Sequence, residues 1–178
     1  MPIKTIFLDR DGVINKDVNY AYKIVDFEFI DGIFEVCIYF QNLGYKIIIV
    51  TNQSGISRGY FTERDFQIIT NWMIAQFNKN DINILDVFHC PHSIDSNCNC
   101  RKPKPGLLLE AGKKWDVDFK KSFMIGDRWR DIEAGKKLGC KTIFLDYKYN
   151  ETKPKKPSFV SDTLFNAVHI IEKHIYEK

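Results

Sequence analysis

The sequence predicts an α/β fold of three layers, in which helices cover both faces of a mainly parallel β-sheet. Short apolar segments alternate with amphipathic helical segments along the chain, and this alternation is typical of parallel sheets. The run Lys46 to Val50 contains three consecutive isoleucines, as expected of a strand buried on both faces. The chain has 178 residues, 44% of them hydrophobic, which predicts a single domain over residues 1–178.

The first half of the chain supplies three of the expected strands. They are residues 4–8, 46–50 and 84–88, each of which is short and apolar. Residues 10–31 lack periodicity and predict a loop, after which a helix runs from Asp31-Gly32 to about Gly44. Thr62 is typical of a helix N-cap, with acidic residues in the following turn. Phe66, Ile69, Met73 and Phe77 then recur at helical spacing, which predicts an amphipathic helix.

The second half continues the alternation. Pro105 to Trp115 predicts a helix with proline at its start. A strand at 122–125, a helix at 129–138 closed by Gly139 and a strand at 142–145 follow. A polar stretch with prolines at 150–158 then leads to a last helix at about 161–174.

Charge and composition narrow the range of functions. The net charge of +3 is too small to indicate a nucleic-acid partner, and no apolar run approaches the roughly 20 residues of a membrane span. The chain enters a strand-like segment at once, without a signal-peptide pattern, so we expect a cytoplasmic location. The cysteine count is odd, at five, which favours a reduced compartment and a metal site over disulfides.

Polar groups follow three of the predicted strands. Asp9 and Asp11 follow the first, Thr51 to Ser54 follow the second, and Gly126-Asp127 follow the fourth. Doubly wound sheets bind ligands at the carboxyl ends of their strands. These three clusters are therefore expected to meet at one edge.

The pair Asp9 and Asp11 can serve phosphoryl transfer. An ionised carboxylate beside Mg²⁺ can attack phosphorus, and a second carboxyl can protonate the leaving oxygen and later activate water. Asp127 adds a further oxygen ligand, and such a set suits Mg²⁺. The alternative is that Asp9 and Asp11 merely form the turn before Gly12. Likewise, Thr51 can bind a phosphate oxygen or cap a helix, and the basic residues Arg101 and Lys102 can bind phosphate or form a solvated face.

Four ordered motifs resemble those of the haloacid-dehalogenase (HAD) phosphatase superfamily. They are Asp9-Arg10-Asp11-Gly12, Thr51, Lys102, and Gly126-Asp127 with Asp131. The segments 7–15, 26–32, 50–56 and 90–106 further resemble the heptose 1,7-bisphosphate phosphatase family, to which the histidinol-phosphate phosphatase domain is related. The resemblance covers about residues 3–147. It implies a Rossmann-like fold and hydrolysis of a sugar bisphosphate through an aspartyl-phosphate. The motifs are separated by no large insertion, so we expect no large cap domain.

The resemblance also implies roles for individual residues. Asp9 is expected to be the nucleophile and Asp11 the proton donor and later base, while Asp9, the main-chain carbonyl of Asp11 and Asp127 bind Mg²⁺. Thr51 and Lys102 are expected to hold the phosphoryl group. Substrate contacts are expected from the remaining members of the set, namely Asp17, Val18, Asn19 and Tyr20 of a small flap, Asn52, Gln53, Ser54, Arg101 and Arg128. Val18-Asn19 and Trp129-Arg130-Asp131 depart from the family pattern, so the sequence leaves the substrate and the role of Asp131 open.

Cys90, His92, Cys98 and Cys100 form a Cys₃His set, which is one of the ligand sets of structural Zn²⁺. The one-residue gaps are shorter than the usual two, and the alternative is a group of unrelated loop cysteines. The resemblance implies zinc as well. Because Arg101 and Lys102 follow directly, we expect the metal to order the loop at 90–100 and so to position both basic side chains.

Competing functions are histidinol-phosphate or other sugar-phosphate hydrolysis, a catalytically dead sugar-phosphate binder, and a zinc-stabilised nucleic-acid module. The last is disfavoured by the small net charge and the lack of a basic helix, and the dead binder by the full carboxylate set. We expect a monomer that acts on a small phosphorylated metabolite.

Overall fold

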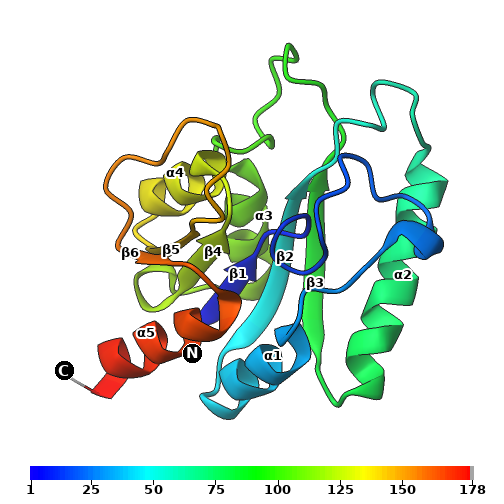
Figure 1. Cartoon of the computed structure of the whole chain (residues 1–178). Helices are drawn as coiled ribbons and strands as arrows, with labels where there is room; N and C mark the ends of the chain where they lie inside the picture. The colour runs from blue at the N-terminus through cyan, green and yellow to red at the C-terminus, as the bar shows by residue number, and fades with distance from the viewer. Residues whose placement is uncertain (177–178) are drawn as a thin grey trace.

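The computed structural model describes residues 1–176 and contains one six-stranded sheet (Figure 1). The strands are β1 (Thr5–Leu8), β2 (Lys46–Asn52), β3 (Ile84–Cys90), β4 (Phe123–Gly126), β5 (Lys141–Leu145) and β6 (Phe159–Ser161). Their order is β3-β2-β1-β4-β5-β6, and each neighbouring pair is parallel. The predicted three-layer parallel fold is confirmed.

Helices lie on both faces of this sheet (Figure 1). They are α1 (Ile33–Asn42), α2 (Glu63–Lys79), α3 (Gly106–Trp115), α4 (Trp129–Lys137) and α5 (Leu164–Tyr176), with short 3-10 turns η1 (Ile24–Asp26) and η2 (Phe119–Lys121). Thr62 caps α2 as predicted, because its hydroxyl accepts a hydrogen bond from the Asp65 amide.

Two apolar clusters form the core, one on each face of the sheet. Strand residues alternate between them: Ile6 and Leu8 pack with α1, α2 and α5, whereas Phe7 packs with α3 and α4. The same alternation divides Ile47 and Ile49 from Ile48 and Val50. Since successive side chains of a strand point to opposite faces, a central strand covered on both faces must be apolar throughout.

The structure corrects several of the predicted elements. The sequence predicted that β2 ends at Val50, but the strand continues through Thr51 and Asn52, so these residues belong to the strand itself. The short edge strand β6 was missed, because three residues next to a proline-rich segment carry too weak a pattern. Helix α5 begins at Leu164, three residues after the predicted start.

No large cap interrupts the described part of the chain. Between β1 and α1 it holds only a loop with the 3-10 turn η1. Within residues 1–176, no helix is long and apolar enough to span a membrane.

Candidate active site

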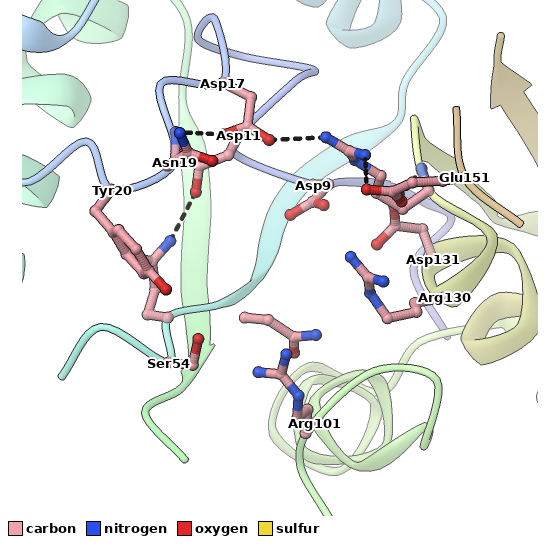
Figure 2. A pocket seen from close by; sticks show the side chains of 13 residues that line it. Asp9, Asp11, Asp17, Asn19, Tyr20, Ser54, Arg101, Arg130, Asp131 and Glu151 are labelled. Atoms are coloured by element: carbon pink, nitrogen blue, oxygen red, sulfur yellow. Dashed lines mark hydrogen bonds and ion pairs between the residues drawn. The ribbon is translucent and has the colours of Figure 1, made fainter. Parts of the chain in front are cut away.

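A polar cavity of about 240 Å³ opens at the carboxyl ends of β1, β2 and β4 (Figure 2). Its lining residues come from five separate segments, and they are Asp9, Asp11, Asp17, Asn19, Tyr20, Asn52, Gln53, Ser54, Arg101, Arg128, Arg130, Asp131 and Glu151. The predicted convergence of the strand ends therefore holds, and most of the expected substrate residues lie in one cavity. Val18 does not line it and is 47% exposed.

Lys102 is buried beneath the cavity, with 1% of its surface exposed. Its Nζ lies 2.9 Å from Asp9 Oδ1 and 2.7 Å from Asp131 Oδ1, and it donates to the Val50 carbonyl at 2.7 Å. These three acceptors use all three ammonium protons. Burial acts to lower the pKa of Lys102, but the two carboxylates outweigh it, so the pKa lies above its usual value. Lys102 is thus a fixed positive charge beside Asp9.

Asp9, Asp127 and Asp131 bring one carboxylate oxygen each within 4.8 Å of the others. Burial, followed by repulsion from Asp131, raises the pKa of Asp9 to about 7, although Lys102 opposes the shift. Burial and the charges of Asp131 and Asp9 raise the pKa of Asp127 to about 8. Both carboxylate oxygens of Asp127 are buried and accept no hydrogen bond, and the ion pair of Oδ2 with Arg128 Nε is long, at 3.3 Å. Three buried carboxylates this close together are costly unless further positive charge binds them, so this donor set fits a hard divalent ion.

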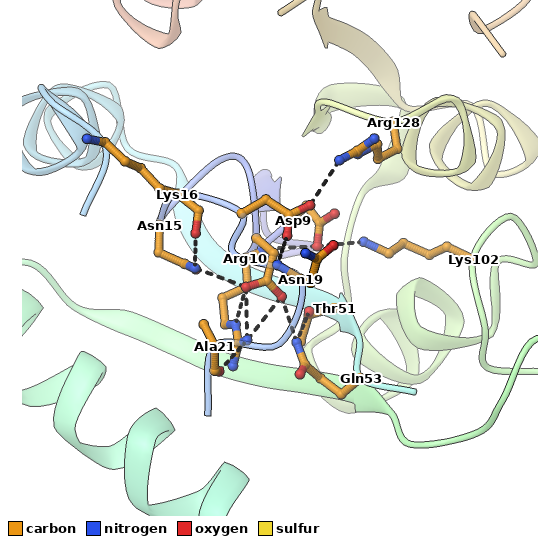
Figure 3. Close-up of polar contacts among 12 residues, drawn as sticks. Asp9, Arg10, Asn15, Lys16, Asn19, Ala21, Thr51, Gln53, Lys102 and Arg128 are labelled. Carbon is orange, nitrogen blue, oxygen red and sulfur yellow. Dashed lines mark hydrogen bonds and ion pairs between the residues drawn. The ribbon is translucent and has the colours of Figure 1, made fainter. Parts of the chain in front are cut away.

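Asp11 is held by a separate network, whose donors Arg10, Asn15 and Gln53 are labelled in Figure 3. Its carboxylate accepts hydrogen bonds from Arg10 Nη2 at 2.9 and 3.0 Å, from Asn15 Nδ2 at 2.9 Å and from Gln53 Nε2 at 2.9 Å. Gln53 also donates to Thr51 Oγ1 at 2.8 Å. The carboxylates of Asp9 and Asp11 are therefore fixed by different donor groups, and that of Asp11 lies outside the three-carboxylate group.

Arg128 lies among three carboxylates. Its guanidinium contacts Asp17 at 2.9 Å, Asp127 at 3.3 Å and Glu151 at 2.5 Å, and it stacks 4.0 Å from the centre of the Tyr149 ring. It thereby joins the flap at Asp17 to the loop between β5 and β6. The expected contact between Arg128 and a substrate phosphate stays a prediction.

The four predicted zinc ligands come together beside the cavity. Their ligand atoms lie within 4.8 Å of one another. Cys90 is the last residue of β3, and the other three come from the loop that follows. Two further contacts bind this loop to the basic segment, since Arg101 Nη1 donates to the His92 carbonyl at 3.3 Å and Lys104 Nζ to the Cys98 carbonyl at 2.6 Å. The arrangement fits a closed four-coordinate Zn²⁺ site.

Three residues of the cavity wall had no role in the prediction from sequence: Asp131, Arg130 and Glu151. Asp131 was noted without a function, yet it contacts Lys102 and belongs to the three-carboxylate group. Arg130 was seen only as a departure from a pattern. Glu151 lies in a polar loop with no local signal, and only the fold brings it to Arg128.

Comparison with known proteins places the chain among phosphatases. It is 42% identical to "D-glycero-alpha-D-manno-heptose-1,7-bisphosphate 7-phosphatase" of Photorhabdus laumondii, over 96% of this chain and 97% of that protein. It is 51% identical to the protein of the same name from Campylobacter jejuni, over 82% of this chain and 83% of that protein. Further relatives carry the same name for the beta anomer.

Two other comparisons agree. The family model for HAD-hydrolase-like proteins matches residues 99–167. The D,D-heptose 1,7-bisphosphate phosphatase from B. bronchiseptica, solved with magnesium and phosphate, superposes with a TM-score of 0.88 at 25% identity, over 97% of this chain and 99% of that one. The fold is therefore the Rossmann-like fold of the HAD superfamily.

Proposed function

This chain belongs to the family of D-glycero-D-manno-heptose-1,7-bisphosphate 7-phosphatases, and we propose that it hydrolyses the 7-phosphate of that sugar bisphosphate to give heptose 1-phosphate. The geometry that carries the proposal is the position of Asp9 at the end of β1. Its Oδ1 accepts a hydrogen bond from the Arg10 amide at 2.7 Å and contacts Lys102 at 2.9 Å. Both contacts use Oδ1, which leaves Oδ2 to attack phosphorus.

The residues to hold Mg²⁺ are Asp9, Asp127 and the main-chain carbonyl of Asp11. The buried oxygens of Asp127, which accept no hydrogen bond, support this assignment. When bound, the ion would reduce the electrostatic repulsion between the anionic nucleophile and the anionic ester. Asp131 has Lys102 and the Arg128 amide as partners, at 2.7 and 3.1 Å, so we assign it a positioning role.

The reaction proceeds in two displacements. Asp9 forms a bond to phosphorus while the bond to the ester oxygen breaks, and Asp11 gives its proton to the leaving oxygen. Arg10 then stabilises the carboxylate that Asp11 has become. In the second displacement Asp11 takes a proton from water, the water oxygen bonds to phosphorus, and the bond to Asp9 breaks to release inorganic phosphate.

Lys102 and Thr51 are the groups assigned to the transferred phosphoryl group. Both are 1% exposed, and each contacts a residue that lines the cavity: Lys102 contacts Asp9, and Thr51 accepts a hydrogen bond from Gln53. Lys102 already contacts Asp9, so a phosphoryl group on Asp9 lies within its reach. A fixed, desolvated charge of this kind stabilises the negative charge of the transition state.

A phosphate-release assay tests the proposal. Purified protein is given Mg²⁺ and either anomer of heptose 1,7-bisphosphate, with histidinol phosphate as the rival substrate. We expect turnover of a heptose bisphosphate at a kcat/KM at least about 100-fold above that of histidinol phosphate, and phosphorus NMR that shows loss of the 7-phosphate. Preference for histidinol phosphate, or retention of the 7-phosphate, contradicts the proposal.

The remaining expectations stay predictions: zinc at the Cys₃His site, one domain over residues 1–178, a monomer and a cytoplasmic location. The single sheet supports the prediction of one domain. The reduced thiols that a zinc site needs support the prediction of a cytoplasmic location. Sedimentation of the purified protein tests the monomer.

A further inference from the structure

Arg10 is a charged residue in the core of the protein. It stands between Asp9 and Asp11 in sequence, but its side chain is only 1% exposed and does not line the cavity. Its guanidinium carbon lies 5.9 Å from the centres of both the Phe27 and the Phe66 rings. Burial of a charge is costly and is tolerated where the partners of the charge satisfy it. The partners of Arg10 therefore indicate its role.

The hydrogen bonds of Arg10 reach two groups (Figure 3). Nη2 donates to Oδ1 and Oδ2 of Asp11, at 2.9 and 3.0 Å, and Nε donates to Oδ1 at 3.3 Å. Nη2 also donates to the Ala21 carbonyl at 2.9 Å. Nη1 is buried and has no hydrogen-bond partner among residues 1–176. One nitrogen, Nη2, thus joins the carboxyl group assigned as the catalytic acid to the main chain at Ala21.

Ala21 directly follows the flap. Asp17, Asn19 and Tyr20 of the flap line the cavity, whereas Ala21 is buried, with 1% of its surface exposed. A movement of the flap that displaces the Ala21 carbonyl must either break its hydrogen bond to Nη2 or carry Nη2 along. Because Nη2 also binds both oxygens of Asp11, such a movement changes the orientation of the acid.

Asp11 has to serve both displacements from one position. The leaving oxygen departs from the side of the phosphoryl group opposite Asp9, and the attacking water approaches from the same side. Both steps therefore need the Asp11 carboxyl group within hydrogen-bond reach of that side. Arginine stays charged and offers a planar set of donors, so it can hold the carboxyl group through both steps without exchanging a proton.

We propose that Arg10 is a positioning residue that couples the flap to the catalytic acid. It orients the Asp11 carboxyl group for proton transfer while the flap holds Ala21 in the position described here. A substrate that orders the flap thereby also orders the acid. Arg10 does not line the cavity, so it acts through Asp11. The inference rests on the proposed phosphatase function and adds a link between substrate binding and proton transfer.

The test compares a substrate that needs the acid with one that does not. Heptose 1,7-bisphosphate loses an alkoxide, which is protonated as it leaves, whereas p-nitrophenyl phosphate loses a phenolate that is stable as an anion. Rapid acid quench measures formation of the aspartyl-phosphate in a single turnover. We expect Arg10→Lys to slow this step about 10- to 100-fold with the heptose ester and less than about threefold with p-nitrophenyl phosphate. Hydrolysis of the intermediate, which uses Asp11 as base, should slow equally after either substrate.

Lys16→Gln is the matched control for the loss of a basic residue. Lys16 lies in the same loop and pairs with Glu28 at the surface. This variant should keep both rates near the parent values. Thermal unfolding shows whether each variant is folded. Equal slowing of aspartyl-phosphate formation with the two substrates in folded Arg10→Lys overturns the role of Arg10 in positioning the acid.

Tyr22→Ala tests the flap. Tyr22 follows Ala21, does not line the cavity and stacks on Phe61, with the ring centres 5.4 Å apart. Loss of this stacking should loosen the flap and slow the acid-dependent substrate more than p-nitrophenyl phosphate. When Tyr22→Ala is combined with Arg10→Lys, it should have little further effect, because the coupling is already broken. Effects that multiply overturn the coupling. If Arg10→Lys does not fold, equal slowing of the two substrates in Tyr22→Ala overturns it instead.

Failure of the proposed function gives a different result. If the parent protein cleaves p-nitrophenyl phosphate but not heptose 1,7-bisphosphate, the substrate proposal is wrong. Glycerol 2-phosphate then replaces the heptose ester as the substrate with an alkoxide leaving group, and Arg10→Lys must still slow it more than p-nitrophenyl phosphate. A parent protein that cleaves none of the three esters contradicts both proposals.

Discussion

The side chain of Asn52 is hydrogen-bonded to both the amide and the carbonyl of the Lys102 main chain. Asn52 Oδ1 accepts a hydrogen bond from the Lys102 amide at 3.0 Å, and Asn52 Nδ2 donates to the Lys102 carbonyl at 3.1 Å. This reciprocal pair joins the last residue of β2 to the segment after the Cys₃His loop. It fixes the backbone from which Lys102 reaches Asp9, so two distant parts of the chain cooperate in placing one ammonium group.

Replacing Asn52 with alanine should therefore misplace Lys102. Both hydrogen bonds to the Lys102 backbone are lost, which we expect to lower the free energy of unfolding by about 1–3 kcal/mol and kcat by about tenfold. Asn78→Ala, on the exposed face of α2, is the control and should leave both quantities near the parent values. Urea unfolding and steady-state kinetics measure the effects. A kcat in Asn52→Ala equal to that of the control contradicts this role.

Asp9→Asn should abolish covalent chemistry while the fold is kept. The amide has almost the same shape as the carboxylate but is not a nucleophile, so kcat should fall by at least about 1,000-fold. The parent protein, quenched in acid during turnover, should carry a phosphoryl group that mass spectrometry assigns to Asp9. Asp31→Asn, an exposed carboxyl outside the cavity, should turn over like the parent. Parent-like turnover by folded Asp9→Asn would falsify the mechanism.

Cys98→Ser should remove a zinc ligand and lower activity indirectly, through the loop that precedes Arg101 and Lys102. The loop loses the ligation that orders it, so bound zinc, melting temperature and kcat should fall together. Cys140→Ala is the control, because Cys140 is buried in the core but is not one of the four ligands, so this variant should keep its zinc. Atomic absorption gives the metal content. Full activity in a zinc-free protein contradicts the positioning role of the metal.

The stabilising effect of Mg²⁺ should increase with pH. The pKa of Asp9 rises from 3.8 to about 7 and that of Asp127 from 3.8 to about 8 on folding without metal. The folded state thus holds protons that the unfolded chain releases. This contribution to stability is complete below pH 3.8 and is lost as the pH rises through about 7 to 8.

Because Mg²⁺ binds the ionised carboxylates, the rise in melting temperature on adding Mg²⁺ should be larger near pH 8 than near pH 6. Differential scanning fluorimetry at both pH values measures it. Asp127→Asn is the control, and its Mg²⁺-dependent shift should be much reduced at either pH. A shift in the parent protein that is the same at both values, or that is larger near pH 6, contradicts the assignment.

Gly12→Ala should damage the metal site through steric overlap. Gly12 has φ of +86°, and a Cβ there would lie 2.0 Å from Asp127 Oδ2. Asp127 must therefore move, and Mg²⁺ affinity should fall by at least about tenfold. Gly59 also has a positive φ, of +73°, but a Cβ at that position would meet no atom within 4 Å, so Gly59→Ala carries only the backbone strain. Isothermal titration with Mg²⁺ compares the two, and equal affinities in both variants contradict the steric argument.

The sequence by itself determined the sheet, its buried strands and the chemical groups at their ends. Apolar runs and helical spacing are local signals, so they predicted the elements that hold Asp9, Thr51 and Asp127. The strand that the sequence did not predict, β6, has only three residues and is recognised as a strand because it pairs with β5. The Cys₃His set was also visible, because its ligands lie within eleven residues of sequence.

Only the tertiary structure decided which charges meet. Lys102 pairs with Asp9 and Asp131, and Arg128 with Asp17 and Glu151, across separations that no local pattern records. Arg128 and Arg130 stand two residues apart and look equivalent in sequence, yet carboxylates surround one and none contacts the other among residues 1–176. That difference arises from folding, since it depends on where distant loops place their carboxylates.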